Sequence, residues 1–332
     1  MSSRIRSFAA ASASVSRERA SMPYSTREFT IGPNDSGRRI DRILRVLLAE
    51  TTLSGVYRLL RDGSVRVSGK RVDGSYRTKA GDVLEIRVDD SSFSGATAVR
   101  KSGSAGLFRS IIILETEDIA IVNKPRGMLT HGEGGVDEAA RAYYSDRSAA
   151  ALAFSPAPLH RLDRNTSGAL AVSASLAGAV AFSAALRDGL VGKTYLALLS
   201  GDMPREEDWI DELGRDTDAR ISYAGVSGKR AEARAKPLLR SGAYTLASIA
   251  LGTGRTHQIR AQAAARGYAL AGDSKYGGAP FSGGYILHCA SIELPPGIAG
   301  EGPVRASAPL PSDAIRRLGL VFGAGSVEAL LR

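Results

Sequence analysis

Apolar residues in the first part of the chain recur with the spacing of amphipathic helices. Two series are present, the second ending just before Gly63: Ile40, Ile43, Leu44, Leu47 and Leu48, then Leu53, Val56, Leu59 and Leu60. Residues three or four positions apart share one side of a helix, and a glycine after the last apolar position favours a helix end. The pattern predicts two short helices, each with one apolar face.

The periodicity after Gly63 changes from helical spacing to alternation. Apolar and polar residues alternate over 65–67 and again over 84–88, and Ser68-Gly69 between them is typical of a turn. Two helices followed by strands therefore form a small unit, for which we expect the bounds 37–88.

The longer part of the chain alternates between strand and helix signals. Apolar runs predict strands over 111–114, 119–122, 169–172, 193–199 and 244–251, and helical patterns cover 176–187 and 257–266. Each helical pattern runs into a glycine, Gly189 or Gly267, which favours a helix end. The fold class expected is α+β, with an extended mixed or antiparallel sheet, over residues 108–315.

Composition separates these units from their surroundings. Ser, Gly and Ala dominate the stretch 89–106, which indicates a flexible linker over 89–107. The first two dozen residues are rich in Ser, Ala and Arg, which resembles a transit peptide but better fits a disordered extension over 1–36. Met22 remains an alternative start of the protein. A C-terminal tail is expected over 316–332.

Charge and cysteine content narrow the class of partner. The chain carries 44 Lys and Arg against 34 Asp and Glu, a net charge of +10, and residues 37–88 alone contribute +6. Such a basic unit attracts polyanions. The single cysteine, Cys289, excludes an intramolecular disulfide, and four histidines offer no zinc-ligand spacing, so we expect no metal and a reducing, cytoplasmic location. No segment approaches the roughly 20 apolar residues of a membrane span.

The small basic unit is similar to the S4 RNA-binding domain. The segments "RRIDRILRVLLAE" and "VYRLLRDGSVRVSGKRV" carry this resemblance over about 50 residues. It implies that the helix arginines bind RNA, and the candidates are Arg42, Arg45, Arg58 and Arg61. The alternative is that these arginines only solvate the surface, as most charge runs do.

One polar loop before an apolar strand carries the chemistry of the larger domain. Its sequence, "HRLDRNTSG" over 160–168, resembles the central motif of the RluA-type pseudouridine synthases. Three further segments agree with that family in type and order: "IVNKPRGMLTHGEGG", "KTYLALLSG" and "GRTHQIRAQAAARGYALAGDSKYGG". Four ordered motifs over some two hundred residues identify the chain as a member of this family.

The resemblance implies three catalytic residues. Asp163 corresponds to the nucleophilic carboxylate, Arg260 to the cation that pairs with it through two donors, and Tyr195 to the aromatic ring that stacks on the target base. Taken singly, these residues would be a turn cap, a solvated charge and a core aromatic. The tyrosine is also a candidate base for the C5 proton, although a phenol with a pKa near 10 is a weak base.

The same resemblance implies residues that bind the substrate. Leu287 would be an aliphatic wall opposite the tyrosine, and Arg161 would fill the space that the flipped nucleotide leaves in the RNA. His160 would order the loop and line the substrate site. Lys124 would lie in a turn that either approaches the RNA backbone or is merely structural. The pair Gly272-Asp273 would close a loop behind the site.

The reaction implied is the isomerisation of uridine to pseudouridine in RNA. Uridine contains every atom of its isomer, so we expect neither a metal nor an organic cofactor. Members with an S4 domain mostly modify large-subunit (23S) ribosomal RNA, and "THGEGG" looks closest to their type-C branch. The alternatives are a transfer RNA enzyme of the same family and a non-catalytic S4-type ribosome-associated factor. We expect a monomer.

Overall fold

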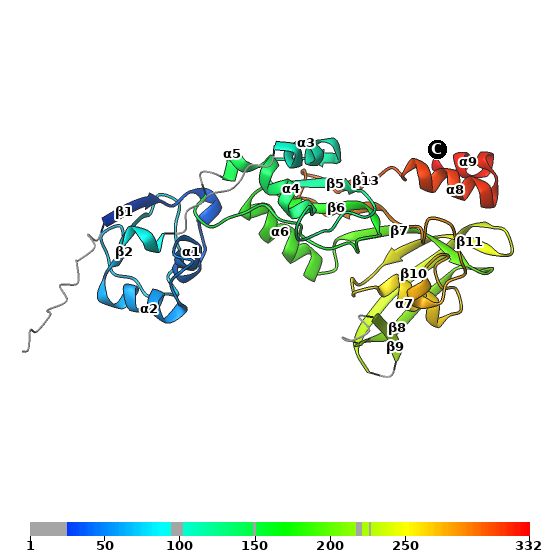
Figure 1. Ribbon diagram of the computed structural model, residues 1–332, viewed down its shortest axis with the longest axis horizontal. Coiled ribbons are helices and arrows are strands. Elements are labelled where there is room, and N and C mark those ends of the chain that lie inside the picture. Colours follow the sequence, from blue (N-terminus) through cyan, green and yellow to red (C-terminus); the bar gives the residue numbers. More distant parts are fainter. Residues whose placement is uncertain (1–24, 94–101, 149–150, 217–220, 226) are drawn as a thin grey trace, which may run out of the picture.

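The computed structural model describes residues 25–93, 102–148, 151–216, 221–225 and 227–332. The small N-terminal domain lies at one end of an elongated molecule, and the larger domain extends away from it (Figure 1). The expected α+β class is confirmed, because the small domain has its own helices and sheet and the larger domain is built on one mixed sheet.

The small domain packs two helices against a three-stranded antiparallel sheet. Its elements are β1 (Ser25–Thr30), η1 (Pro33–Asp35), α1 (Ile40–Leu47), α2 (Leu53–Asp62), β2 (Val65–Val67), β3 (Val83–Val88) and η2 (Asp90–Ser92). Both predicted helices and the two predicted strands are confirmed. The second helix ends at Gly63 with φ of 82°, a left-handed conformation that glycine adopts without strain. The apolar faces of both helices form the core with β2 and β3.

The predicted disorder of residues 1–36 is wrong for its last part. Residues 25–36 form β1 and η1, and β1 pairs with β3 from Ser25 opposite Val88 to Thr30 opposite Val83. The segment "STREFT" has little apolar alternation and so gave no strand signal. It still forms an edge strand, because backbone hydrogen bonds to β3 supply much of its stability. The segment 1–24, with Met22 and the transit-peptide alternative, lies outside the described residues.

The expected linker over 89–107 is also shorter than predicted. Residues 89–93 continue the small domain, where the Phe93 ring lies 6.0 Å from that of Phe29. Helix α3 (Ser102–Ser110) already belongs to the larger domain, because its buried Phe108 packs against two tyrosine rings of the following helical segment. The rest of the expected linker, 94–101, lies outside the described residues.

A ten-stranded sheet forms the body of the larger domain. Its strands are β4 (Ile112–Glu115), β5 (Ile119–Lys124), β6 (Ser167–Ser173), β7 (Gly192–Ser200), β8 (Glu207–Asp216), β9 (Ile221–Gly225), β10 (Lys229–Arg240), β11 (Tyr244–Leu251), β12 (Leu287–Leu294) and β13 (Val304–Ser307). The order is β4-β5-β6-β12-β7-β11-β10-β8-β9, with β13 beside β12. Among the strands that the structure describes, β6 and β12 alone pair in parallel, so the expected mixed or antiparallel sheet is confirmed as mixed and mostly antiparallel.

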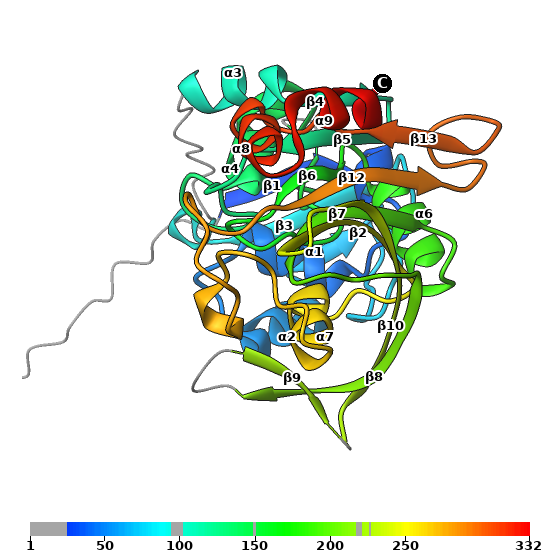
Figure 2. The ribbon, with the colours of Figure 1, turned by 90° about the vertical axis from the view of Figure 1, so that its right-hand side faces the viewer.

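Helices cover both faces of this sheet. They are α4 (Val136–Tyr143), α5 (Ser145–Ser148), α6 (Leu176–Arg187), α7 (Gln258–Ala265), α8 (Ser312–Phe322) and α9 (Ala324–Leu331), with the short η3 (Ser274–Tyr276). Figures 1 and 2 show α4 and α6 on opposite sides of β5 and β6. The strands β8 and β10 bend around α7, which packs against β8 and β9 (Figure 2).

The chain end is folded, contrary to the tail expected over 316–332. Helices α8 and α9 occupy it, and they bury Leu318 and Val327 against Leu198 and Leu246 from strands β7 and β11. The burial of these two side chains depends on an apolar patch supplied by distant strands. This contact explains why the end forms part of the larger domain.

A buried carboxylate joins the two domains. Asp35, fully buried, accepts hydrogen bonds from the backbone N–H groups of Leu152, Ala153 and Phe154 at 2.5, 2.9 and 3.1 Å. The neighbouring Asn34 side chain accepts a hydrogen bond from the N–H of Leu176, at the start of α6. Hydrogen bonds to a charged acceptor are stronger than neutral ones, so this contact fixes the small domain at the base of α6.

Candidate active site

The loop that carries Asp163 is held on both sides of that residue. On one side, the Thr130 hydroxyl donates to the Leu162 carbonyl at 2.7 Å and accepts from the N–H of Leu162 at 3.2 Å. On the other side, the Gly127 N–H donates to the Arg164 carbonyl at 2.8 Å. A carboxylate held by neighbours on both sides keeps its direction, as a catalytic group requires.

The loop leads into β6 through a glycine that the packing requires. Gly168 has φ of 109°, and a Cβ at this position would lie 2.2 Å from the carbonyl oxygen of Cys289 on β12. Any side chain would therefore push β6 and β12 apart at the one parallel pairing of the sheet. The glycine that ends the "HRLDRNTSG" motif thus sets how closely the loop approaches β12.

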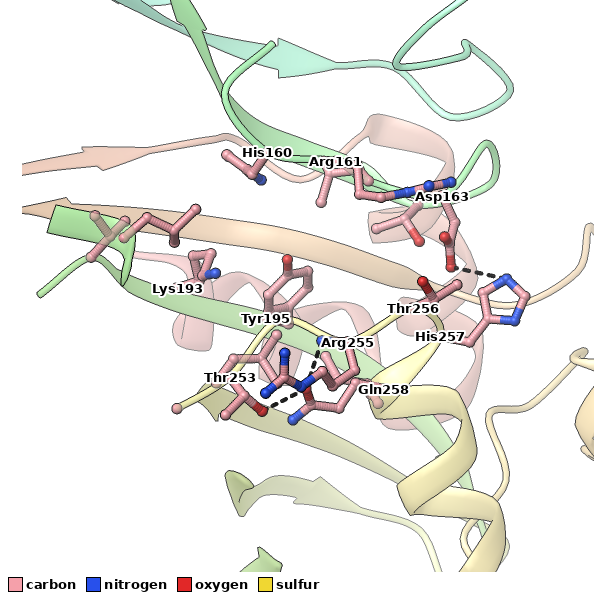
Figure 3. A pocket seen from close by; sticks show the side chains of 18 of the residues that line it. His160, Arg161, Asp163, Lys193, Tyr195, Thr253, Arg255, Thr256, His257 and Gln258 are labelled. Atoms are coloured by element: carbon pink, nitrogen blue, oxygen red, sulfur yellow. Dashed lines mark hydrogen bonds and ion pairs between the residues drawn. The ribbon is translucent and has the colours of Figure 1, made fainter. Parts of the chain in front are cut away.

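A cavity of about 520 Å³ opens beside this loop. The loop lines one side, β7 lines a second side, and the turn from Thr253 to the start of α7 lines a third. Figure 3 shows Tyr195 and Lys193 on the same strand, below the loop that carries Asp163. This volume is in the range of small-molecule sites, and it is sufficient for one nucleoside.

A histidine and an arginine face Asp163, whose side chain is 19% exposed. The His257 Nε2 atom lies 3.7 Å from a carboxylate oxygen of Asp163, and the Arg260 guanidinium lies 3.9 Å from the same oxygen. Both distances exceed that of a hydrogen bond. The carboxylate is therefore partly open to the cavity, with positive charge on one side.

The expected two-donor pair between Arg260 and Asp163 is wrong. The fork of Arg260 binds Asp273 instead, with Nε and one terminal nitrogen at 2.6 and 2.7 Å from its two oxygens. The rings of Tyr276 and Tyr285 lie 4.7 and 4.9 Å from the guanidinium carbon. Burial opposes the charge of Arg260, but these hydrogen bonds and nearby negative groups raise its pKa. Asp273 takes the fork because a buried acid needs a charged partner.

Tyr195 and Leu287 line the cavity from adjacent strands. Both are buried, on β7 and β12, and Tyr195 pairs in register with Cys289. Burial raises the pKa of the Tyr195 phenol well above its usual value of 10, and the neighbouring Cys289 and Asp163 act in the same direction. The neutral phenol therefore fits a stacking role better than that of a proton acceptor.

Two residues expected to bind substrate form hydrogen bonds within the protein instead. Lys124 is fully buried, and its ammonium donates to the carbonyls of Pro125, Met128 and Arg164, so the expected contact with the RNA backbone is wrong. His160 lines the cavity, but its Nε2 atom accepts the N–H of Ala171 at 3.0 Å. Burial lowers the pKa of Lys124 to about 8 and that of His160 to about 3.

The remaining predicted binding residues are exposed. Arg161 lies at the edge of the cavity, and the small domain presents its four arginines to solvent. Arg42 and Arg45 are three positions apart on α1, as are Arg58 and Arg61 on α2, so each pair lies on one side of its helix. None of these five residues forms an ion pair with another described residue.

Three residues near the cavity were not among the predicted site residues. His257 stands in the "GRTHQIR" segment and Asp273 in the "GDSKYGG" segment, where the pair Gly272-Asp273 was expected only to close a loop. Lys193 is 8% exposed, lines the cavity and has no hydrogen-bond or ion-pair partner among the described residues; burial lowers its pKa. A lysine two positions from Tyr195 on a strand faces the same side, which is the signal that was available.

The described residues contain no group of three His, Cys, Asp or Glu side chains arranged to hold a metal ion. Within the same residues, no helix has the length and apolar character that a bilayer crossing requires.

Comparison with known proteins identifies both domains. Residues 118–265 match the family model for RNA pseudouridylate synthase, and residues 38–84 match the S4 domain. The human protein named RNA Pseudouridylate Synthase Domain Containing 1 has a similar structure, with a TM-score of 0.50 and 25% identity, covering 60% of this chain and 83% of the human one.

Two bacterial relatives align over most of the chain. Ribosomal large subunit pseudouridine synthase C of Vibrio vulnificus is 31% identical over 293 residues, which cover 83% of this chain and 90% of the relative. The protein of the same name from Escherichia coli O157:H7 is 30% identical, with 88% and 95% covered. These alignments, together with the two family matches, show that the chain belongs to the RluA-type RNA pseudouridine synthases, which are RNA isomerases, and carries their N-terminal S4 domain.

Proposed function

We propose that the protein isomerises particular uridines of large-subunit ribosomal RNA, with Asp163 as the catalytic carboxylate. The observation that supports this substrate is the alignment with relatives named for the ribosomal large subunit, which extends over 83% to 88% of the chain. The exposed arginines of α1 and α2 support RNA binding by the small domain, since unpaired cations on one side of a helix suit phosphate contacts.

The catalytic role of Asp163 rests on its place beside the cavity. A target uridine leaves its stack, and its base enters between Tyr195 and Leu287, whose apolar surfaces replace the lost stacking. The sugar carbon C1′ then faces Asp163, which either adds to C1′ or takes a proton from C2′. Both routes start from an ionised carboxylate and break the C1′–N1 bond.

The remaining steps complete the isomerisation within one nucleotide. The uracil turns in the cavity and C5 bonds to C1′. In the first route this breaks the ester bond between Asp163 and C1′, and in the second Asp163 returns its proton to C2′. C5 then loses its proton and N1 gains one, so the atoms balance without a co-reactant. The buried Arg260 keeps positive charge near the developing anion, and Asp273 keeps that arginine fixed. Tyr195, as a neutral phenol, holds the base by its ring.

Mapping of pseudouridine in cells that lack the gene tests the substrate. We expect particular positions of large-subunit ribosomal RNA to lose the modification and to regain it when the wild-type gene is restored. Restoration of the Asp163→Asn gene is the matched control and should leave those positions unmodified. Loss confined to transfer RNA would contradict the ribosomal substrate, and an unchanged map in both RNAs would contradict the proposal as a whole.

A further inference from the structure

The charge balance around Asp163 leaves a role for His257. The fork of Arg260 is used by Asp273, and only its remaining nitrogen faces Asp163, at 3.9 Å. The His257 Nε2 atom is nearer, at 3.7 Å, and its side chain is 16% exposed (Figure 3). A small movement on substrate binding would bring this nitrogen within hydrogen-bond distance of the carboxylate.

The hydrogen-bond partner of the His257 Nδ1 atom indicates which of the two ring nitrogens carries the hydrogen. The Nδ1 atom lies 2.9 Å from the Tyr276 hydroxyl, and that hydroxyl accepts the backbone N–H of Ser222 at 2.9 Å. The hydroxyl also has one hydrogen to donate, and Nδ1 is the acceptor that the described residues offer it. The hydrogen of a neutral imidazole then lies on Nε2, the atom that faces Asp163.

Strand β9 holds this arrangement from outside the cavity. Ser222 of this strand donates its N–H to the Tyr276 hydroxyl. The Ser222 hydroxyl donates to the carbonyl of Thr256, the residue before His257, at 2.7 Å. His257 itself has φ of 53°, a left-handed conformation that is uncommon for residues other than glycine. Such a conformation persists only where the surrounding contacts fix it, and it turns the imidazole toward Asp163.

We propose that His257 is a positioning residue: its Nε2–H holds the Asp163 carboxylate in the reactive direction, and Tyr276, bound by strand β9, sets that tautomer. The inference rests on the proposed catalytic role of Asp163. The charged groups that act on His257 are Asp163, Asp273, Arg260 and Lys275, and burial is the largest influence, so that its pKa is lowered and the ring is neutral at neutral pH. Neutrality allows one nitrogen to donate and the other to accept.

Nitrogen-15 NMR of the full-length protein tests the tautomer directly. The chain has four histidines, so selective labelling gives few signals, and His257→Asn assigns the relevant one. We expect the Nε2–H form at neutral pH. In Tyr276→Phe, which retains the ring beside Arg260 but lacks the hydroxyl, the His257 pKa should rise because its neutral form loses a hydrogen bond. An Nδ1–H form or a doubly protonated ring in the wild type would overturn the proposal.

Single-turnover rates at saturating RNA test the positioning role. His257→Ala should slow isomerisation on the order of 10- to 100-fold, as loss of an orienting contact usually does, with RNA affinity unchanged. His257→Gln has an amide N–H near the Nε2 position and should recover part of the rate, although both variants share the strain of the left-handed backbone. His131→Ala, at an exposed histidine outside the cavity, is the matched control. Equal rates for the Ala and Gln variants, or a wild-type rate for Ala, would contradict the proposal.

The two proposals fail in different ways. An active, folded Asp163→Asn protein would remove the catalytic role of Asp163, and with it the reason for positioning that residue. An inactive Asp163→Asn protein together with wild-type rates in the His257 variants would remove only the positioning role. If His257→Ala does not fold, the tautomer of the wild-type ring and its response to Tyr276→Phe still decide the question.

Discussion

The small domain and the cavity beside Asp163 use positive charge in different ways. In the small domain, the four arginines of α1 and α2 are exposed and have no ion-pair partner among the described residues. In the cavity, the side chain of Arg260 is 8% exposed, bound at two points by Asp273 and enclosed by two tyrosine rings. Exposed charges contribute additively to RNA affinity, and salt screens their attraction for phosphate. A buried, fixed charge acts on the reacting atoms only when it is held at the right position. Substitutions in the small domain should therefore change RNA affinity and its salt dependence, whereas substitutions in the cavity should change the rate of isomerisation.

The largest effect is expected for Asp163→Asn, which keeps the size of the side chain and removes its charge. Isomerisation, measured as tritium release from C5-labelled uridine, should become undetectable because both routes need an ionised carboxylate. RNA affinity should hardly change, since binding is spread over many contacts. Thermal melting must show a folded protein, because the variant leaves cations beside a neutral group. A folded variant that releases tritium near the wild-type rate would refute the catalytic role.

A second large effect is expected for Arg260→Lys, which keeps the charge but lacks the planar fork that Asp273 binds. The rate at saturating RNA should fall on the order of 100-fold, because a displaced charge no longer faces the reacting atoms. RNA affinity should stay the same. Arg266→Lys is the matched control, since Arg266 follows the same helix and binds Asp211 outside the cavity. Similar losses in both variants would argue against a specific role for Arg260.

A moderate effect, on binding alone, is expected when the four small-domain arginines are replaced by alanine together. Each phosphate contact adds roughly 0.7 to 0.9 to the slope of log affinity against log salt, so the slope should fall by about 3. Single replacements should give about a quarter of this change, and the rate at saturating RNA should persist. Arg316→Ala, an exposed residue of α8, is a control. An unchanged slope would mean that these arginines only solvate the surface.

The smallest effect concerns stability in acid and the neutral His160 ring. Its folded pKa is about 3, against 6.5 for an exposed histidine. Between these values the unfolded chain takes up a proton that the folded protein excludes, so stability falls as pH is lowered through this window. His160→Gln retains an acceptor for the N–H of Ala171 and does not titrate. The free energy of unfolding, measured with urea at several pH values, should fall less steeply with decreasing pH in the variant than in the wild type. The difference in slope should be at most about 1.4 kcal/mol per pH unit. Identical pH dependence would contradict a neutral His160 ring in the folded protein.

The sequence predicted best those parts whose signal lies within one segment. The bounds of α6 and β11 are as expected, because the glycines and apolar spacing that define them are local. Strand β1 and helices α8 and α9 were missed as ordered elements. Their stability comes from β3 and from a patch on β7 and β11, which are distant in sequence. Local patterns carry little information about such partners.

The candidate site was likewise predicted where the signal is local and missed where it depends on partners distant in sequence. The family resemblance predicted Asp163, Tyr195 and Leu287 as residues of one site, and all three line the cavity. The partner of Arg260 and the burial of Lys124 could not be predicted, because the lysine is held by carbonyls from separate turns and the arginine by an acid thirteen residues further on. A residue type indicates which bonds are possible, whereas the fold decides which are made.

The carboxylate of Asp35, with its three backbone donors, has a consequence for avidity. If α1 and α2 and the cavity both contact RNA, as proposed, a joint held in this way keeps the two surfaces at one separation and one mutual angle. RNA bound at α1 and α2 then raises the effective concentration of a uridine at the cavity only when that uridine lies at the matching distance. Under the proposed function, the joint would therefore select RNA by the spacing of two structural elements as well as by base sequence.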